Sequence, residues 1–185
     1  MCERGYHGLK CKKSRGRRSR HESVNDIIAR ALRTAEIPNF REPPGCSRAD
    51  GKKPDGLTLV PWRQGKSLVW DFTCVDTVCP TYVAQTAKVP GAAARLAETK
   101  KEKKYDFLKD RYIFVPVAIE TLGGYGPEAW KFGEVLGERL RMATNEPRSS
   151  MFLKQRISIA IQRGNAAAIL GTLPAGGGFA KLFNL

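Results

Sequence analysis

The sequence lacks any long hydrophobic run. No uninterrupted apolar stretch in its 185 residues approaches the ~20 residues that a membrane-spanning helix needs, so we expect no membrane partner. The first twenty residues are basic and have no apolar centre, which does not fit a secretory signal peptide. The five cysteines are odd in number and widely spaced, which argues against a secreted disulfide scaffold and favours a reducing, intracellular compartment.

Acidic residues are scarce. The chain has 18 Asp and Glu against 32 Lys and Arg, which gives a formal net charge of +14. Hydrophobic residues make up 42% of the sequence, which is enough for a packed core and excludes a wholly disordered chain. A strongly basic folded domain indicates a polyanionic partner, with nucleic acid as the first candidate.

The N-terminal segment holds half of this net charge. Residues 1–20 contain eight lysines and arginines against the single acid Glu3. We interpret residues 1–21 as either a basic arm or a partial zinc knuckle, outside the core. The side chains expected to contact nucleic acid are Lys12, Lys13, Arg15, Arg17, Arg18 and Arg20.

Four residues of the same segment could bind zinc. Cys2, His7, Cys11 and His21 supply two sulfurs and two nitrogens, which suits a tetrahedral Zn²⁺ site, although their spacing is not that of a standard zinc finger. The simpler alternative is that these cysteines are free thiols in a basic arm.

The remainder predicts one α/β (or α+β) domain over residues 22–173, followed by a flexible tail, 174–185. Helical periodicity and turn signals place the first helix from Ser23 and the hairpin strands near 57–60 and 67–75. The same signals predict helices near 92–111, 127–142 and 150–170 and a strand over 112–119.

Two acids flank the predicted hairpin. Asp55 precedes its first strand, and Asp71 lies within the apolar second strand, where an ionised carboxylate is costly unless it is compensated. If the turn is 64–66, Arg63 pairs with Ser67 and Asp71 lies opposite Leu59, which puts both acids on one face of the sheet. Two adjacent carboxylates repel each other, and a divalent cation such as Mg²⁺ or Mn²⁺ would relieve the repulsion.

One face of the 92–111 helix carries a lysine. Ala97, Lys101, Tyr105, Leu108 and Tyr112 recur at intervals of three and four residues, with Lys104 beside them. An inward Lys101 near the two acids could stabilise a negatively charged transition state or orient water. The alternative is a solvated charge run in which nearby glutamates pair with the lysines.

These motifs occur in a characteristic order. Arg20-His21 is followed by Asn25, then by EP at 42–43, GKKPDG at 51–56, WDFTCVD at 70–76 and KEKKY at 101–105. The ordered set resembles the restriction-like endonuclease domain that follows the reverse transcriptase in site-specific non-LTR retrotransposon polyproteins. This resemblance implies a PD-(D/E)XK core, with a mixed central sheet and a catalytic β-hairpin flanked by helices.

The resemblance also implies an activity. It suggests a Mg²⁺-dependent endonuclease that nicks target DNA, with Asp55 and Asp71 as metal ligands. Thr73 stands where the fold usually carries lysine, and the retrotransposon branch instead draws the lysine from the next helix, at positions matched by Lys101, Lys104 and Tyr105. The related domains also carry a Cys/His knuckle just upstream.

The implied partners are DNA, element RNA and the reverse transcriptase domain of the same polyprotein. A DNA substrate also implies that the protein acts in the nucleus. The alternative is a catalytically inactive nucleic-acid-binding domain of the same fold, because Thr73 replaces the usual lysine.

Overall fold

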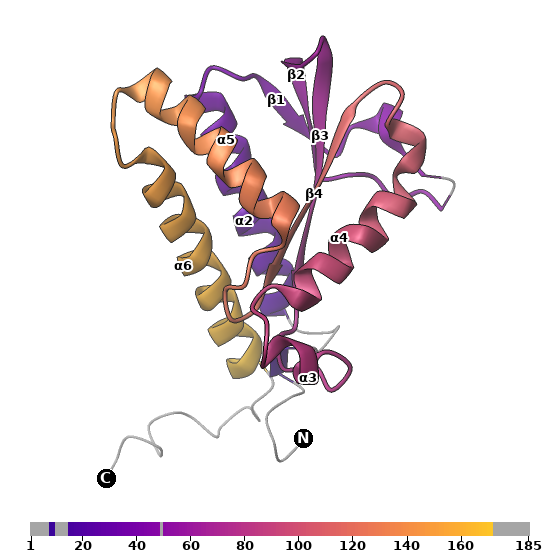
Figure 1. Ribbon diagram of the computed structural model, residues 1–185, viewed down its shortest axis with the longest axis vertical. Coiled ribbons are helices and arrows are strands. Elements are labelled where there is room, and N and C mark those ends of the chain that lie inside the picture. The colour runs from indigo at the N-terminus through magenta and orange to yellow at the C-terminus, as the bar shows by residue number, and fades with distance from the viewer. Residues whose placement is uncertain (1–7, 10–14, 49, 172–185) are drawn as a thin grey trace.

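The computed structural model describes residues 8–9, 15–48 and 50–171, and it is a mixed α+β domain (Figure 1). A four-stranded sheet has the order β1-β2-β3-β4, in which β3 and β4 run parallel and the other neighbours antiparallel. The strands are β1 (Asn39–Arg41), β2 (Gly56–Arg63), β3 (Lys66–Val75) and β4 (Ile113–Glu120). The α-helices are α2 (Arg15–Thr34), α3 (Val83–Thr86), α4 (Ala92–Lys104), α5 (Pro127–Thr144) and α6 (Ser149–Leu170).

The sheet separates two groups of helices. Figure 1 shows α4 on one side and α2, α5 and α6 on the other. Leu68, Trp70 and Phe72 of β3 join the larger core with α2, α5 and α6, whereas Val69 joins a smaller cluster with Tyr105. Since successive strand residues point to opposite faces, this alternation directs Asp71 toward α4. Among the described residues, no helix combines the length and apolar character needed to span a membrane.

The hairpin register differs from the predicted one. Arg63 pairs with Lys66 across a tight turn, and irregularities on either side of Pro61 shift the ladder until Gly56 pairs with Trp70. Continued one step beyond β2, this register would set Asp55 opposite Asp71, where the prediction set Leu59. The shift is an even number of residues, so the prediction that both acids share a face survives the wrong register.

Helix α2 begins at Arg15, well before the helix start predicted at Ser23. Helix α6 provides the reason, because its close approach gives these early turns a packing surface. A side chain at Gly16 would meet the backbone of Ala168 at 2.2 Å. Arg20 is 2% exposed and its guanidinium donates to Asn165. The expectation that residues 1–21 lie wholly outside the core was therefore wrong for the turn that contains Arg20.

Other elements differ less. Helix α4 ends at Lys104, short of the predicted Arg111, and a short 3₁₀ turn follows over Asp106–Leu108. Strand β4 and helices α5 and α6 lie within one or two residues of their predicted bounds. The short β1 and α3 were not predicted, because segments of three and four residues carry too little periodicity.

Glu98 of α4 joins the two helices that flank β4. Its carboxylate accepts hydrogen bonds from the backbone N–H groups of Ala129 (2.9 Å) and Glu128 (3.2 Å) at the start of α5. Burial raises the pKa of Glu98 from 4.5 to about 7, although those two donors oppose the shift. Between these pH values the folded state binds more protons than the unfolded state, so this group makes the protein less stable as the pH rises.

We expect Glu98→Gln to remove this contribution. The free energy of unfolding, measured by urea denaturation between pH 4.5 and 7, should fall less steeply in the variant than in the wild type. Glu102→Gln on the same helix is the matched control and should retain the wild-type slope. Equal slopes for wild type and Glu98→Gln would contradict the assignment.

Candidate functional site

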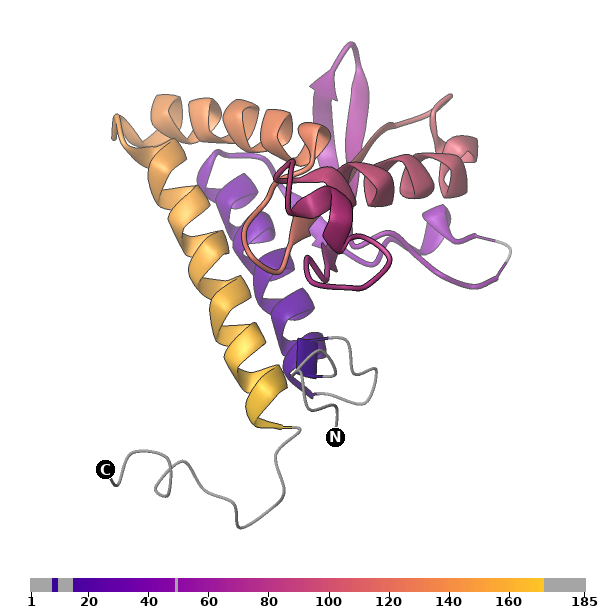
Figure 2. The same ribbon diagram turned by 60° about the horizontal axis from the view of Figure 1, so that its bottom comes forward.

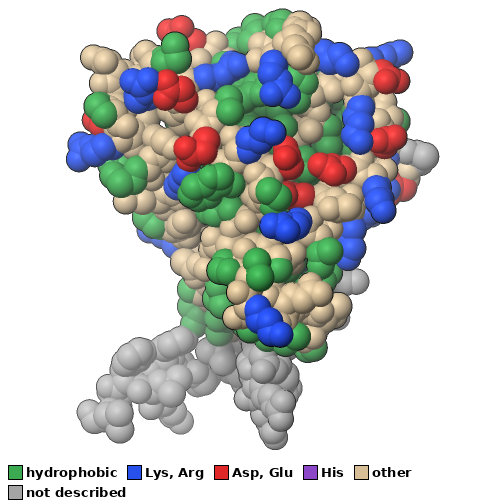
Figure 3. Space-filling model, in the orientation of Figure 1, with side chains coloured by type: hydrophobic (Ala, Val, Ile, Leu, Met, Phe, Trp, Pro, Cys, Tyr) green, Lys and Arg blue, Asp and Glu red, His purple; other side chains and the backbone are tan. Residues whose placement is uncertain are grey.

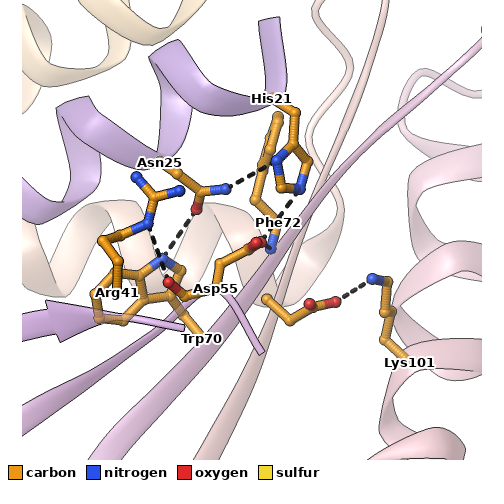
Figure 4. A network of polar contacts seen from close by, with 8 residues as sticks. His21, Asn25, Arg41, Asp55, Trp70, Phe72 and Lys101 are labelled. Atoms are coloured by element: carbon orange, nitrogen blue, oxygen red, sulfur yellow. Dashed lines mark hydrogen bonds and ion pairs between the residues drawn. The ribbon is translucent and has the colours of Figure 1, made fainter. Parts of the chain in front are cut away.

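A cleft of about 510 Å³ opens where α2, the hairpin and α4 meet. Figure 4 shows its polar network, in which His21 and Asn25 come from α2 and Lys101 from α4. The lining residues are His21, Glu42, Arg48, Gly51, Lys52, Lys53, Asp55, Asp71, Lys101, Lys104 and Tyr105. All five residues predicted to act in catalysis therefore line one cleft, although they come from three separate parts of the sequence.

Asp71 and Lys101 form an ion pair across the interface between β3 and α4. The side chain of Asp71 is 6% exposed and that of Lys101 is 25% exposed. The prediction that Lys101 faces the sheet is confirmed. The alternative, in which glutamates on its own helix pair with the lysines, fails for Glu98, which caps α5 instead.

Asp55 is held by its backbone and its side chain. The amide of Phe72 donates to Asp55 Oδ2 at 2.6 Å, and His21 Nε2 lies 3.3 Å from the same oxygen. Arg41 Nε and the amide of Glu42 both donate to the Asp55 carbonyl, at 3.0 and 3.1 Å. Two donors therefore hold the carboxylate, and two more hold the backbone of the same residue, so the carboxylate is preorganised.

The two carboxyl groups have opposite pKa shifts. Burial raises the pKa of Asp71, and the nearby charge of Asp55 adds to the rise, while Lys101 opposes it. Burial would also raise the pKa of Asp55, but the hydrogen bond and charge of His21 together with the Phe72 amide lower it overall. Burial would lower the pKa of His21, and its interactions with Asp55 raise it instead.

Tyr105 and Lys104 occupy different parts of the cleft wall. Tyr105 is buried, 4.8 Å from Phe114 between ring centroids, and the Arg48 guanidinium lies 5.6 Å from its ring. Burial, followed by the charge of Asp71, raises the Tyr105 pKa, so its phenol stays protonated at neutral pH. Lys104 is exposed at the rim.

The donor set fits a hard divalent cation. Asp55 and Asp71 supply carboxylate oxygens in an open cleft, and Mg²⁺ characteristically binds one or two carboxylates and completes its shell with water and phosphate. Their mutual repulsion contributes to the raised pKa of Asp71, and a cation between them would relieve it. The described residues hold no group of three or more His, Cys, Asp and Glu side chains suited to a metal.

His21 is the residue that the sequence assigned to a different site. It was predicted as a zinc ligand with Cys2, His7 and Cys11, which lie outside the described residues. In the structure both of its ring nitrogens face partners in the cleft, Asn25 and Asp55. The separation of four residues between His21 and Asn25, on one helical face, was the available signal.

The predicted nucleic-acid-binding residues divide into three groups. Lys12 and Lys13 lie outside the described residues, and Arg15 begins α2. Arg17 and Arg18 are exposed. The prediction that Arg20 contacts nucleic acid was wrong, because its guanidinium is buried against Asn165 and cannot meet a phosphate. On the face in Figure 3, basic and acidic side chains are interspersed over α4 and α5, without a patch of one sign.

Fold and site together define a mixed α+β domain with an acidic pair and a lysine in one cleft. No protein-family model matches the chain, and a search of curated protein sequences found no significant match.

Proposed function

We propose that this chain is a metal-dependent DNA endonuclease module of a retroelement polyprotein, built on a PD-(D/E)XK-type core. The observation that carries the proposal is the meeting of Asp55, Asp71 and Lys101 in one cleft. Two carboxylates and a lysine are the groups that metal-assisted hydrolysis of a phosphodiester needs. The hairpin and the neighbouring parallel strand β4 agree with that core.

Each group has a role that its surroundings support. Asp55 and Asp71 would hold Mg²⁺ or Mn²⁺, and the bound cation would supply Lewis acidity at a phosphate oxygen. Lys101 balances the charge of Asp71 before the metal arrives, and its ammonium is placed to stabilise negative charge that develops during hydrolysis. Lys104 at the rim extends this positive charge toward the substrate.

The flanking loop suits an anionic substrate. Arg48, Lys52 and Lys53 also line the cleft, and phosphate contacts from such side chains position a nucleic acid without reading its sequence. The proposed partners are target DNA, element RNA and a reverse transcriptase domain of the same polyprotein. A nuclear site of action follows from the proposed substrate. The zinc knuckle of Cys2, His7, Cys11 and His21 stays a prediction.

The first test combines metal binding with cleavage. Mn²⁺ and Mg²⁺ are titrated calorimetrically into the wild type and into Asp55→Ala/Asp71→Ala, and plasmid nicking is measured on the same samples. We expect binding and nicking in the wild type and the loss of both in the double variant. A wild type that binds no metal and does not nick DNA would refute the proposal.

A second candidate is a catalytically inactive nucleic-acid-binding domain. Two observations favour it: Thr73 replaces the usual lysine, and Lys101 is already engaged with Asp71 as an ion pair. This candidate predicts salt-sensitive DNA binding without metal binding. Like the endonuclease, this candidate predicts that the affinity for DNA depends on the basic N-terminal segment.

That dependence can be measured without disturbing the buried Arg20. We expect Lys12→Ala/Lys13→Ala/Arg17→Ala/Arg18→Ala to weaken duplex binding and to reduce the slope of log K against log salt by up to ~3.5, because each phosphate contact contributes about 0.9. A control variant removes four exposed charges elsewhere: Arg33, Lys88, Arg95 and Lys131. Equal salt slopes for the two variants would show that the basic N-terminal segment does not contact the DNA.

A further inference from the structure

A chain of three polar contacts runs from the core to Asp55 (Figure 4). Trp70 Nε1 lies 3.0 Å from Asn25 Oδ1, and Asn25 Nδ2 lies 3.4 Å from His21 Nδ1. His21 Nε2 then lies 3.3 Å from Asp55 Oδ2. Trp70 and Asn25 are fully buried, so neither can exchange its partner for bulk water.

The Trp70 indole, at one end of this chain of contacts, decides which group donates in each hydrogen bond. An indole N–H can only donate, so it requires the carbonyl oxygen of the Asn25 amide. That requirement fixes which way the amide is turned. The amide nitrogen consequently faces His21, and because an amide NH₂ only donates, His21 Nδ1 has to accept.

We propose that Trp70 and Asn25 select the tautomer of neutral His21 that carries its proton on Nε2 and that directs this N–H at Asp55. A neutral imidazole has one protonated nitrogen, so an accepting Nδ1 leaves the proton on Nε2. The Asp55 carboxylate is the acceptor there. His21 is thus a positioning residue for Asp55.

The consequence for metal binding rests on the proposed function. Two donors, the Phe72 amide and His21 Nε2, meet at Asp55 Oδ2 and fix the carboxylate. A carboxylate that two fixed donors hold in one orientation is preorganised for a cation.

The tautomer can be read by nuclear magnetic resonance. The chain has two histidines, so His7→Gln leaves His21 as the only one. With ¹⁵N-labelled histidine, a long-range ¹H–¹⁵N correlation at about pH 9, well above the ordinary histidine pKa, distinguishes a protonated ring nitrogen from a bare one. We expect Nδ1 to be bare and Nε2 to be protonated.

Replacing the amide by a carboxylate should change that result. In Asn25→Asp the Trp70 N–H keeps an acceptor, but the group that faces His21 Nδ1 can now only accept. We therefore expect the Nδ1 signal to shift from the bare type to the protonated type. Asn145→Asp, at the exposed C-terminal cap of α5, makes the same chemical change elsewhere and should leave the spectrum of His21 unchanged.

The spectrum of His7→Gln is decisive by itself and does not depend on the folding of Asn25→Asp. A protonated Nδ1 in His7→Gln would overturn the inference. Plasmid nicking on the same samples separates the two proposals. Nicking with a protonated Nδ1 contradicts only the tautomer, whereas a bare Nδ1 in a protein that neither binds metal nor nicks contradicts only the nuclease.

Discussion

Replacing Asp71 by asparagine is expected to lower Mg²⁺-dependent nicking at least about 1,000-fold while leaving DNA affinity largely unchanged. Asp71 is one of the two acids that we propose to hold the cation, and asparagine keeps its size but removes the charge. Under the proposed function, the affinity for DNA depends on basic side chains at the rim and in the N-terminal segment, which the substitution does not touch. Initial nicking rates and fluorescence anisotropy on labelled duplex measure the two effects.

The control for this substitution is Asp106→Asn. Asp106 is exposed after α4, where it pairs with Lys109, and its loss should leave nicking at the wild-type rate. Nicking by Asp71→Asn at the wild-type rate would show that Asp71 is not needed for cleavage. A parallel loss of nicking and of DNA binding would indicate unfolding, which circular dichroism detects.

Replacing Lys101 by methionine should reduce nicking about 100-fold, because the cleft loses the ammonium group that we propose to stabilise negative charge in the transition state. Metal binding should respond in a different way. Without Lys101, the buried Asp71 has lost the group that most opposes its raised pKa, so this pKa should rise further. A higher pKa makes a proton compete more strongly with the cation for Asp71, so we expect Mn²⁺ affinity to depend more steeply on pH in Lys101→Met than in the wild type.

Lys103→Met is the matched control for this experiment. It lies two residues away on the same helix but is exposed and does not line the cleft. Both nicking and the pH dependence of Mn²⁺ affinity should remain those of the wild type. If Lys101→Met and Lys103→Met nick equally well, the lysine has no part in the chemistry and serves only to balance the charge of Asp71.

Much of the candidate site could be predicted because its signals are local. Strand alternation puts Asp55 and Asp71 on one face for any register shift of an even number of residues, so the conclusion tolerated the irregularities around Pro61. Helical spacing likewise put Lys101 and Tyr105 on one stripe, and both line the cleft. Each of these inferences required only the number of residues after which side chains in a strand or helix return to the same face.

His21 and Arg20 could not be placed in this way. They are adjacent in the sequence, and both belong to a segment whose composition indicates a solvated basic arm. Arg20 is buried because Asn165, which is 145 residues away, meets it from α6. His21 faces Asp55 with one ring nitrogen. Its other ring nitrogen faces Asn25, whose amide is in turn contacted by the Trp70 indole. Both placements depend on partners that no local window contains.

The sequence by itself determined the class of the fold, the hairpin with its two acids and the lysine face of α4, because periodicity and turn chemistry are properties of short segments. Only the tertiary structure decided where α2 begins, which of its basic residues is buried and which histidine nitrogen meets Asp55. Those outcomes depend on α6 and β3 packing against α2, and packing between distant elements leaves no pattern in either segment alone.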